Sequence, residues 1–203
     1  MKKLSGWGRF PVIEANEVAP KCERELLTLL QNSDQPFIAR GNGRSYGDSS
    51  INKNLTISMT NFNRFIDWNE VTGELIAESG VLLSDVINYF LPLGWFPFVT
   101  PGTKFVTLGG AIASDVHGKN HHLEGSFGNY INWFEVVDES NNIIRCSKTD
   151  NPELFQWTIG GMGLTGIITK CSMQLKKVET GWIKQNTIIN NNLKETLQSF
   201  DDH

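Results

Sequence analysis

The chain has 203 residues, 39% hydrophobic and 20% charged, and this composition is typical of a globular protein. Its formal net charge is −4, from 18 basic and 22 acidic residues mixed along the chain, so it lacks the basic field that attracts nucleic acid. No apolar run reaches the roughly 18 residues of a membrane span, and no apolar signal-peptide segment follows the basic N-terminus. We therefore expect a cytoplasmic protein whose contact with a membrane, if any, is peripheral.

The hydrophobic pattern predicts helices and strands that alternate along the chain without an internal repeat. Helices are indicated by apolar residues at helical spacing, and strands by short β-branched or aromatic runs between turn residues. Together they favour an α+β fold. The predicted helices cover residues 21–30, 84–91, 151–157 and 193–200, and the predicted strands cover residues 36–39, 55–59, 74–79, 133–137, 167–175 and 182–189.

The last part of the chain differs from the rest. Residues 176–203 offer one predicted strand and one short helix, which together cannot bury a hydrophobic core. We expect one domain over residues 1–175 and the first elements of a second domain over residues 176–203.

Three glycine-rich segments are candidates for binding a phosphate. The first covers residues 39–49, where Gly41, Gly43 and Gly47 lie among two arginines and several serines. Residues without a Cβ allow consecutive backbone N–H groups to turn toward one anion, and a pyrophosphate would fit such a loop. An elaborate hairpin loop uses the same residue types and is an equally good interpretation of this segment alone.

The second segment covers residues 101–118 and includes Gly109 and Gly110 at a predicted helix start. A bare backbone at a helix N-terminus favours phosphate, through its N–H donors and the helix dipole. The alternative is a helix of small residues that packs closely on a strand. The two interpretations are compatible, since such a helix can still present its N-terminus to a ligand.

The third segment, residues 161–166, matches the pattern G-x-G-x-x-G. In a Rossmann unit this pattern follows a strand and opens a helix. Here a predicted helix precedes it and a predicted strand follows it, so we reject the Rossmann assignment. The chain also lacks the G-x-x-x-x-G-K-[ST] loop of nucleotide triphosphate-binding proteins.

His117 and His121 are four residues apart, but the surrounding glycine and asparagine disfavour the helix on which paired histidines bind zinc. Three cysteines far apart in the chain also fit no zinc site or disulfide framework. We therefore predict no metal and reduced thiols. His117 is interpreted either as a donor or proton carrier in a ligand-lining loop or as an ordinary loop histidine.

Taken together, the segments resemble one family. They are residues 39–48, 101–103, 106–113, 115–122, 125–128, 153–155 and 160–167, and their order and spacing match across about residues 7–174. The chain resembles FAD-linked oxidases of the vanillyl-alcohol-oxidase or PCMH type, and within them the group of decaprenylphosphoryl-ribose 2′-oxidases. Each motif is weak alone, but the ordered set is specific.

The resemblance implies a PCMH-type α+β domain over residues 1–175 that binds FAD. In this family FAD takes a hydride at N5 from a sugar carbinol while a base removes the hydroxyl proton. His117 and Lys119 would face the substrate as the catalytic residues. The first loop and the turn at residues 107–110 would hold the pyrophosphate, residues 114–117 would lie beside the flavin, and residues 166–168 would add backbone contacts. The cofactor-binding residues implied are Ala39, Arg40, Gly41, Asn42, Gly43, Arg44, Ser45, Tyr46, Gly47, Asp48, Ser49, Gly102, Thr107, Leu108, Gly109, Gly110, Ser114, Asp115, Val116, His117, Gly166 and Ile168.

Two departures from the family limit what is implied. Covalent members carry a histidine in the first loop, where this chain has Arg44, so the resemblance implies non-covalent FAD. The family's substrate domain, with its active-site lysine and tyrosine, would lie beyond residue 203 or in a separate chain. The expected substrate is a sugar or polyol, including lipid-linked sugars. The alternatives are a flavin-binding module without turnover, as half of a two-chain enzyme or a truncated relic, and a non-flavin nucleotide-binding protein.

Overall fold

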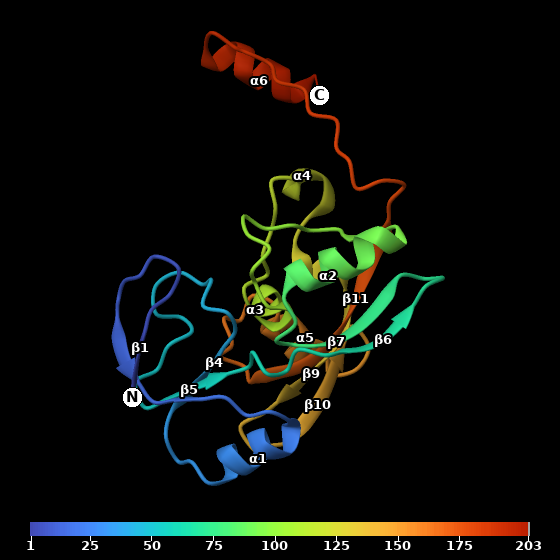
Figure 1. Cartoon of the computed structure of the whole chain (residues 1–203). Helices are drawn as coiled ribbons and strands as arrows, with labels where there is room; N and C mark the ends of the chain where they lie inside the picture. Colours follow the sequence, from blue (N-terminus) through green and yellow to red (C-terminus); the bar gives the residue numbers. More distant parts are fainter. Residues whose placement is uncertain (203) are drawn as a thin grey trace.

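The computed structural model describes residues 1–202 and has two lobes and a C-terminal extension (Figure 1). The N-terminal lobe contains a three-stranded parallel sheet in the order β3-β5-β4, with helix α1 beside it. A two-stranded antiparallel ribbon, β1-β2, lies at its edge. The bounds are β1 Lys2–Leu4, β2 Ile13–Ala15, β3 Glu17–Val18, α1 Glu23–Gln31, β4 Phe37–Arg40 and β5 Leu55–Ser58.

The second lobe is built on an antiparallel sheet in the order β10-β9-β11-β7-β6, with β8 paired to the far end of β11. The central strand β11 is the longest, and its neighbours β7 and β9 are separated from it by many residues in sequence. The strands are β6 Phe65–Asn69, β7 Glu74–Glu78, β8 Trp95–Pro97, β9 Ile131–Val137, β10 Ile143–Ser147 and β11 Ile167–Lys177.

Helices α2, α3 and α5 contribute to the main hydrophobic core against this sheet (Figure 1). Val86 of α2, Ile112 of α3 and Phe155 of α5 pack with sheet residues such as Phe134 and Cys171. The bounds of the helices in this lobe are α2 Leu83–Phe90, η1 Leu91–Leu93, α3 Leu108–Ala113, α4 His121–Glu124, η2 Phe127–Tyr130 and α5 Pro152–Thr158. The α+β class predicted from the sequence is confirmed.

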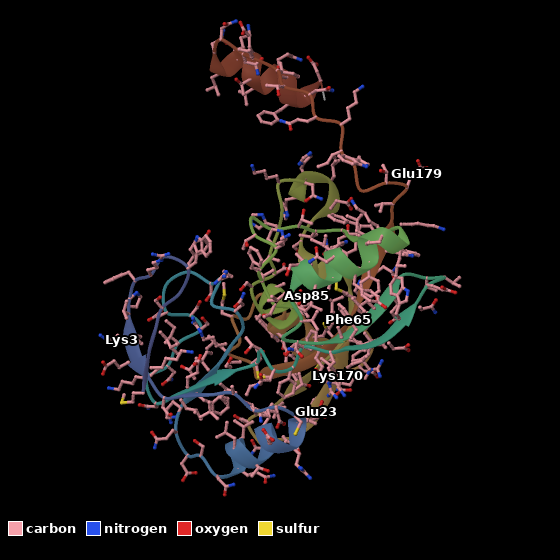
Figure 2. The ribbon with its side chains drawn as sticks, in the orientation of Figure 1. Lys3, Glu23, Phe65, Asp85, Lys170 and Glu179 are labelled. Carbon is pink, nitrogen blue, oxygen red and sulfur yellow. The ribbon has the colours of Figure 1, made fainter. Side chains whose placement is uncertain are left out.

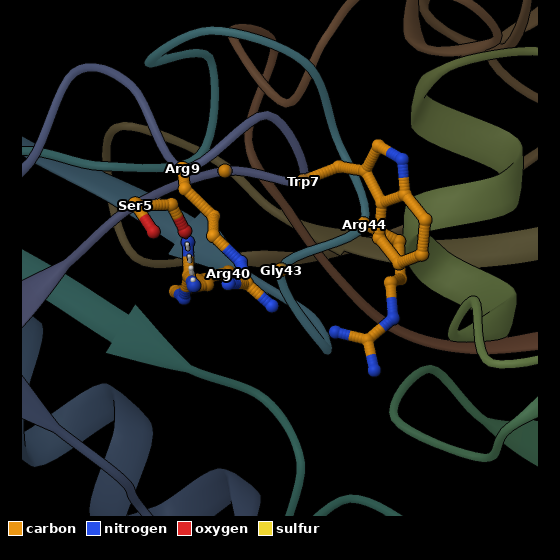
Figure 3. Close-up of a pocket in the computed structure, with 7 residues that line it drawn as sticks. Ser5, Trp7, Arg9, Arg40, Gly43 and Arg44 are labelled. Atoms are coloured by element: carbon orange, nitrogen blue, oxygen red, sulfur yellow. Dashed lines mark hydrogen bonds between the residues drawn. The ribbon is translucent and has the colours of Figure 1, made fainter.

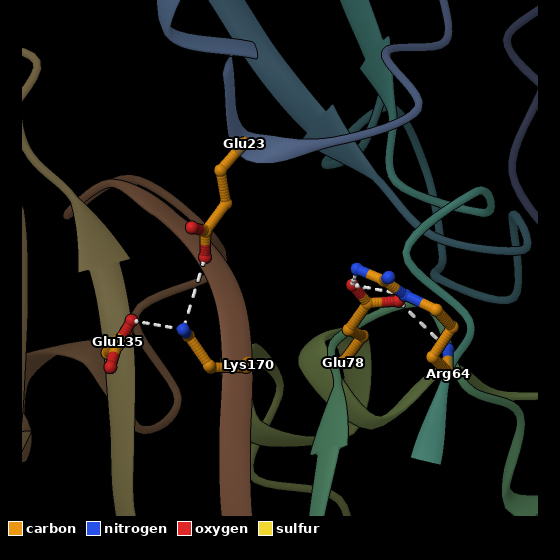
Figure 4. Close-up of polar contacts among 5 residues, drawn as sticks. All are labelled: Glu23, Arg64, Glu78, Glu135 and Lys170. Atoms are coloured by element: carbon orange, nitrogen blue, oxygen red, sulfur yellow. Dashed lines mark hydrogen bonds and ion pairs between the residues drawn. The ribbon is translucent and has the colours of Figure 1, made fainter. Parts of the chain in front are cut away.

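Apolar packing and one ion-pair cluster join the two lobes. A second hydrophobic cluster combines Leu26 and Ile57 of the N-terminal lobe with Val137 and Ile167 of the large sheet. Beside it, Lys170 of β11 lies 3.0 Å from Glu135 and 3.4 Å from Glu23 of α1 (Figures 2 and 4). These contacts place the ends of β4 and β5 beside the large sheet.

A β-bulge near the start of β11 sets which side chains face the core. Ile168 is opposite Val136 and Lys170 is opposite Glu135, so Thr169 is an extra residue on this strand. The Thr169 carbonyl accepts a hydrogen bond from the Ser79 N–H at 2.9 Å. The bulge therefore ties β11 to the turn that follows β7.

The C-terminal extension leaves the sheet after β11 and ends in a helix that stands apart from both lobes (Figure 1). Helix α6 spans Leu193–Asp201 as predicted, but the strand predicted over residues 182–189 does not form. Trp182 is 88% exposed and Ile183 94% exposed. A strand needs a partner for its backbone groups, whereas a helix satisfies its own, which explains why only the helix forms.

No helix among residues 1–202 is long and apolar enough to cross a membrane. The three cysteines are free, and two of them are buried. Burial raises the pKa of the Cys146 thiol to about 11 and that of Cys171 to about 12, so neither is a thiolate near neutral pH.

Candidate functional site

The first glycine segment is a loop that leaves the carboxyl end of β4. None of the backbone N–H groups of residues 41–47 donates a hydrogen bond to another atom of residues 1–202. Gly43 has a φ of 65°, in the left-handed region, and a Cβ there would collide with the Arg40 guanidinium. The loop therefore has the unpaired donors that a phosphate needs.

The second segment forms the start of α3 beside that loop. Thr107 caps the helix, since its Oγ1 accepts from the Gly110 N–H at 3.2 Å. A Cβ at Gly41 would collide with the same hydroxyl, so the first loop touches the helix start. The Asn42 side chain adds a hydrogen bond of 2.9 Å to the Phe105 carbonyl.

The first N–H groups of α3 are not free, which the sequence did not reveal. Leu108 donates to the Val81 carbonyl at 2.9 Å and Gly109 to the Ser79 carbonyl at 2.7 Å. A phosphate beside this helix would therefore depend on the first loop for donors and on α3 for its dipole and bare surface. Gly110 is exposed, whereas Leu108 is fully buried in the core.

The third glycine segment packs on the other end of α3. The Gly160 N–H donates to the Ile112 carbonyl at 3.0 Å, and the Met162 N–H donates to the Ala113 carbonyl at 2.7 Å. Gly166 has a φ of 144°, and a Cβ there would collide with the Val137 carbonyl. Packing on β9 therefore requires a glycine at position 166. As predicted, a helix precedes this segment and a strand follows it.

Helix α3, which belongs to the second segment, thus brings the first and third glycine segments together. The first loop contacts its start, and the third segment contacts its end. Among the predicted contact residues, Ile168 lies in the core, so only its backbone is available to a ligand. Gly102 is exposed with nothing within 4 Å of an added Cβ.

The segment with His117 and Lys119 follows α3 directly. Asp115 has a φ of 38°, and its Oδ1 accepts from the Gly128 N–H at 2.9 Å, which fixes the turn. The side chains of His117 and Lys119 are exposed, and the rings of His117 and His121 are 5.0 Å apart. Residues 1–202 contain no group of three or more histidine, cysteine or acidic side chains that could hold a metal ion.

The sequence analysis missed the N-terminal segment 5–9, which packs on the first loop (Figure 3). The Ser5 carbonyl accepts from Arg40 at 2.8 Å, and the Trp7 N–H donates to the Ser45 carbonyl at 2.8 Å. The Arg44 guanidinium lies 5.5 Å from the centre of the Trp7 ring. The sequence feature that could have revealed this segment is a tryptophan and an arginine among glycines near the N-terminus.

Several polar groups around α3 and the first loop are buried without a hydrogen-bond partner in residues 1–202. They include the Arg44 Nε, the Ser79 Oγ and the Thr169 Oγ1. Burial, and then the charge of Arg44, lower the pKa of Arg40, while Glu17 opposes this shift. The free loop N–H groups, the bare helix surface and the positive charges fit a large anionic ligand such as FAD.

Comparisons with known proteins agree with this chemistry. Residues 17–147 match the family described as FAD binding domain. The chain is 35% identical over 208 residues to decaprenylphosphoryl-beta-D-ribose oxidase of Mycolicibacterium smegmatis, which covers 99% of this chain and 45% of that protein. It is 26% identical over 207 residues to L-gulonolactone oxidase of Bos taurus, with 99% of this chain and 46% of that protein covered.

Cytokinin dehydrogenase 3 of Arabidopsis thaliana is 28% identical over 146 residues, which are 70% of this chain and 28% of that protein. The chain therefore spans less than half the length of these relatives. Their names describe oxidases and a dehydrogenase, and the matched part is the domain that binds the flavin. This protein belongs to the PCMH-type FAD-binding domain family of FAD-linked oxidoreductases, and its cofactor is FAD.

Proposed function

We propose that the protein is the FAD-binding part of an oxidoreductase that oxidises a hydroxyl group of a sugar or polyol. The observation that carries the proposal is the row of unpaired N–H groups at residues 41–47 beside the bare start of α3. A pyrophosphate between these elements would fix the register of FAD along α3, and the flavin end would then lie toward residues 114–117.

The residues after α3 are our candidates for the roles that such a reaction requires. Bound FAD would supply a two-electron acceptor for the hydride of the substrate. His117 and Lys119 are exposed on the segment that leaves α3 and are our candidates for holding the substrate hydroxyl and moving its proton. The turn at Asp115 orients His117 because its carboxylate is anchored to the Gly128 N–H.

The substrate we propose is a sugar or polyol, including sugars attached to a lipid, and further protein completes the site. His117 and Lys119 alone cannot hold a carbinol carbon close to a flavin, and misplaced reactants lose much of the rate. The relatives are more than twice the length of the matched region, which supports a C-terminal domain or a second chain as the missing part.

A flavin-binding module without turnover is the second candidate. The exposure of both candidate catalytic side chains favours it, because no described residue covers them from solvent.

The decisive experiment is anaerobic reduction of the FAD-loaded protein, measured as the loss of flavin absorbance. The 203-residue chain should bind FAD and react negligibly with ribose or polyols, and adding the C-terminal part of a relative should restore reduction. Turnover of about 1 per second or faster by the chain alone would show that no further protein is needed. Absence of reduction under every combination would favour the module without turnover.

A further inference from the structure

The segment that carries His117 and Lys119 belongs to a loop, which a β-bridge between His117 and Ser126 closes at its base. Both candidate side chains are exposed, and neither forms an ion pair with another side chain of residues 1–202. Where they point therefore depends on how the loop is anchored to the rest of the fold.

The first anchor lies on the segment that follows β8. The Asn120 side-chain amide donates to the Phe98 carbonyl at 3.1 Å, and a Cβ at Gly118 would collide with the Thr100 carbonyl. A residue without a Cβ thus allows the loop backbone to lie directly against this segment. Because Gly118 stands between the two candidate catalytic residues, the contact places the backbone of both.

The second anchor holds the end of α4 and is centred on Glu124. Lys176 of β11 lies 2.9 Å from Glu124 Oε1. The Tyr130 hydroxyl lies 2.9 Å from Oε2 and 2.8 Å from the main-chain carbonyl of Glu124, so its single proton is shared between two acceptors. We call Glu124, Tyr130 and Lys176 the Glu124 cluster. Figure 1 shows α4 at the end of the second lobe where β11 leads into the extension.

An aromatic ring supports the Glu124 cluster from below. The rings of Tyr130 and Phe98 are stacked, with 4.0 Å between their centroids and 6° between their planes. The Lys176 Nζ lies 5.6 Å from the centroid of the same Phe98 ring. Phe98 therefore contacts both anchors, because its carbonyl binds Asn120 and its ring packs against Tyr130 and Lys176. Packing thus orients both partners of the Glu124 carboxylate.

The geometry of the Glu124 cluster suits positioning better than stabilisation. The side chains of Glu124 and Lys176 are 25% and 31% exposed, and ion pairs that water reaches contribute only modestly to the free energy of unfolding. A carboxylate that is bonded on both oxygens cannot rotate freely, however. The cluster therefore fixes the last turn of α4, while Asn120 fixes the residue before it.

We propose that the Glu124 cluster positions the loop of residues 117–124, so that His117 and Lys119 keep one orientation toward the flavin end of the site. The proposal rests on the proposed function, since it assigns positioning residues to the same reaction. The three residues of the cluster act through the loop and do not touch the substrate. Without them Asn120 alone holds the loop, and acid–base groups that are loosely held lose much of the rate.

The test uses NMR of the oxidised, FAD-loaded 203-residue protein. The readouts are the ring resonances of His117, assigned with His117→Gln, and the backbone order parameters of residues 117–122. In Tyr130→Phe, which keeps the stacked ring, and in Lys176→Met, the resonances should move. The order parameters should fall from about 0.85, typical of rigid backbone, toward about 0.6. Lys176→Arg keeps the charge and should restore both readouts.

The matched controls are Lys170→Met and Tyr89→Phe. Lys170 lies on the same strand as Lys176 and pairs with Glu135 and Glu23. Tyr89 belongs to another aromatic group, with its ring centroid 5.5 Å from that of Phe65. Lys170→Met should lower the melting temperature at least as much as Lys176→Met and leave the loop unchanged. Equal changes of the loop in controls and cluster variants, or no change in either cluster variant, would overturn the proposal.

Reduction kinetics separate this proposal from the proposed function. In the protein completed with the C-terminal part of a relative, Tyr130→Phe should lower kcat about 10-fold with a smaller change in KM, because it misplaces reacting groups. All variants should retain FAD. An unchanged kcat beside a loosened loop would refute the positioning role. If the unaltered protein is not reduced at all, the proposed function fails, and the NMR comparison still decides whether the Glu124 cluster orders the loop.

Discussion

Replacing Gly110 with valine separates a role in cofactor binding from a role in folding. Gly110 is exposed at the start of α3, and an added Cβ would meet only the Thr107 Oγ1, at 2.9 Å. The side chain would displace the hydroxyl that caps the helix, which costs about 0.5–2 kcal/mol. Valine has a slightly better helix propensity than glycine, by a few tenths of a kcal/mol. We expect a net loss of about 1 kcal/mol, or roughly 2–4 °C in the melting temperature.

The effect on FAD should be larger. The valine methyl groups would fill the surface where we place the pyrophosphate and would move it away from the N–H groups of residues 41–47. Each hydrogen bond to a charged group contributes about 1.5–3 kcal/mol, so losing one weakens FAD binding roughly 10- to 150-fold. Losing two would leave the purified protein without flavin.

Two measurements check this expectation: thermal unfolding of the flavin-free protein and the FAD dissociation constant from quenching of flavin fluorescence. Ile131→Val is the control, because Ile131 is 2% exposed in the core and this change costs about 0.5–1.5 kcal/mol at a distance from the loop. It should lower stability about as much as Gly110→Val and leave FAD affinity unchanged. A Gly110→Val protein that binds FAD within about threefold of the original affinity would refute the placement of the pyrophosphate.

Three further predictions follow from named contacts. Acid precipitation should release FAD into the supernatant, because Arg44 stands where covalent members have a linking histidine, and flavin retained in the pellet would contradict this. Lys170→Met should lower the free energy of unfolding by about 1–3 kcal/mol in urea titrations, since it leaves Glu23 and Glu135 without their cation. Burial alone would lower the pKa of Lys170, but Glu135 and then Glu23 outweigh burial, so the pKa is raised in the folded protein. The contribution of Lys170 to stability is therefore present below about pH 10.4 and is lost at higher pH. Hydrogen bonds from Lys176 and then Tyr130 lower the pKa of Glu124. Glu124→Gln should therefore be less stable than the original protein above about pH 4.3, and this difference should vanish in acid. A difference that persists at about pH 2 would contradict this assignment.

Local sequence patterns predicted part of the secondary structure. Helices α1, α2, α5 and α6 and strands β4, β5, β7, β9 and β11 lie where spacing and turn residues indicated, whereas strands β3, β6, β8 and β10 were not predicted. The strand expected over residues 182–189 does not form, and the physical cause is general. Apolar, β-branched residues favour a strand only where a neighbouring strand accepts its hydrogen bonds, and the extension has none among residues 1–202.

By itself, the sequence determined the α+β class, the three glycine segments and their order, which together identified the FAD-binding family. These properties depend on residue type and local spacing, because a glycine or a helix cap acts on its own neighbourhood.

Only the tertiary structure decided which donors are free. Gly109 looked available at a helix N-terminus, yet its N–H is bonded to the turn after β7, while those of residues 41–47 are unpaired. The tertiary structure also brings Trp7 and Arg9 onto the first loop, across more than thirty residues of sequence. Such pairings join atoms distant in the chain, and their partners are set by how β7, β11 and the lobes pack, which no local pattern encodes.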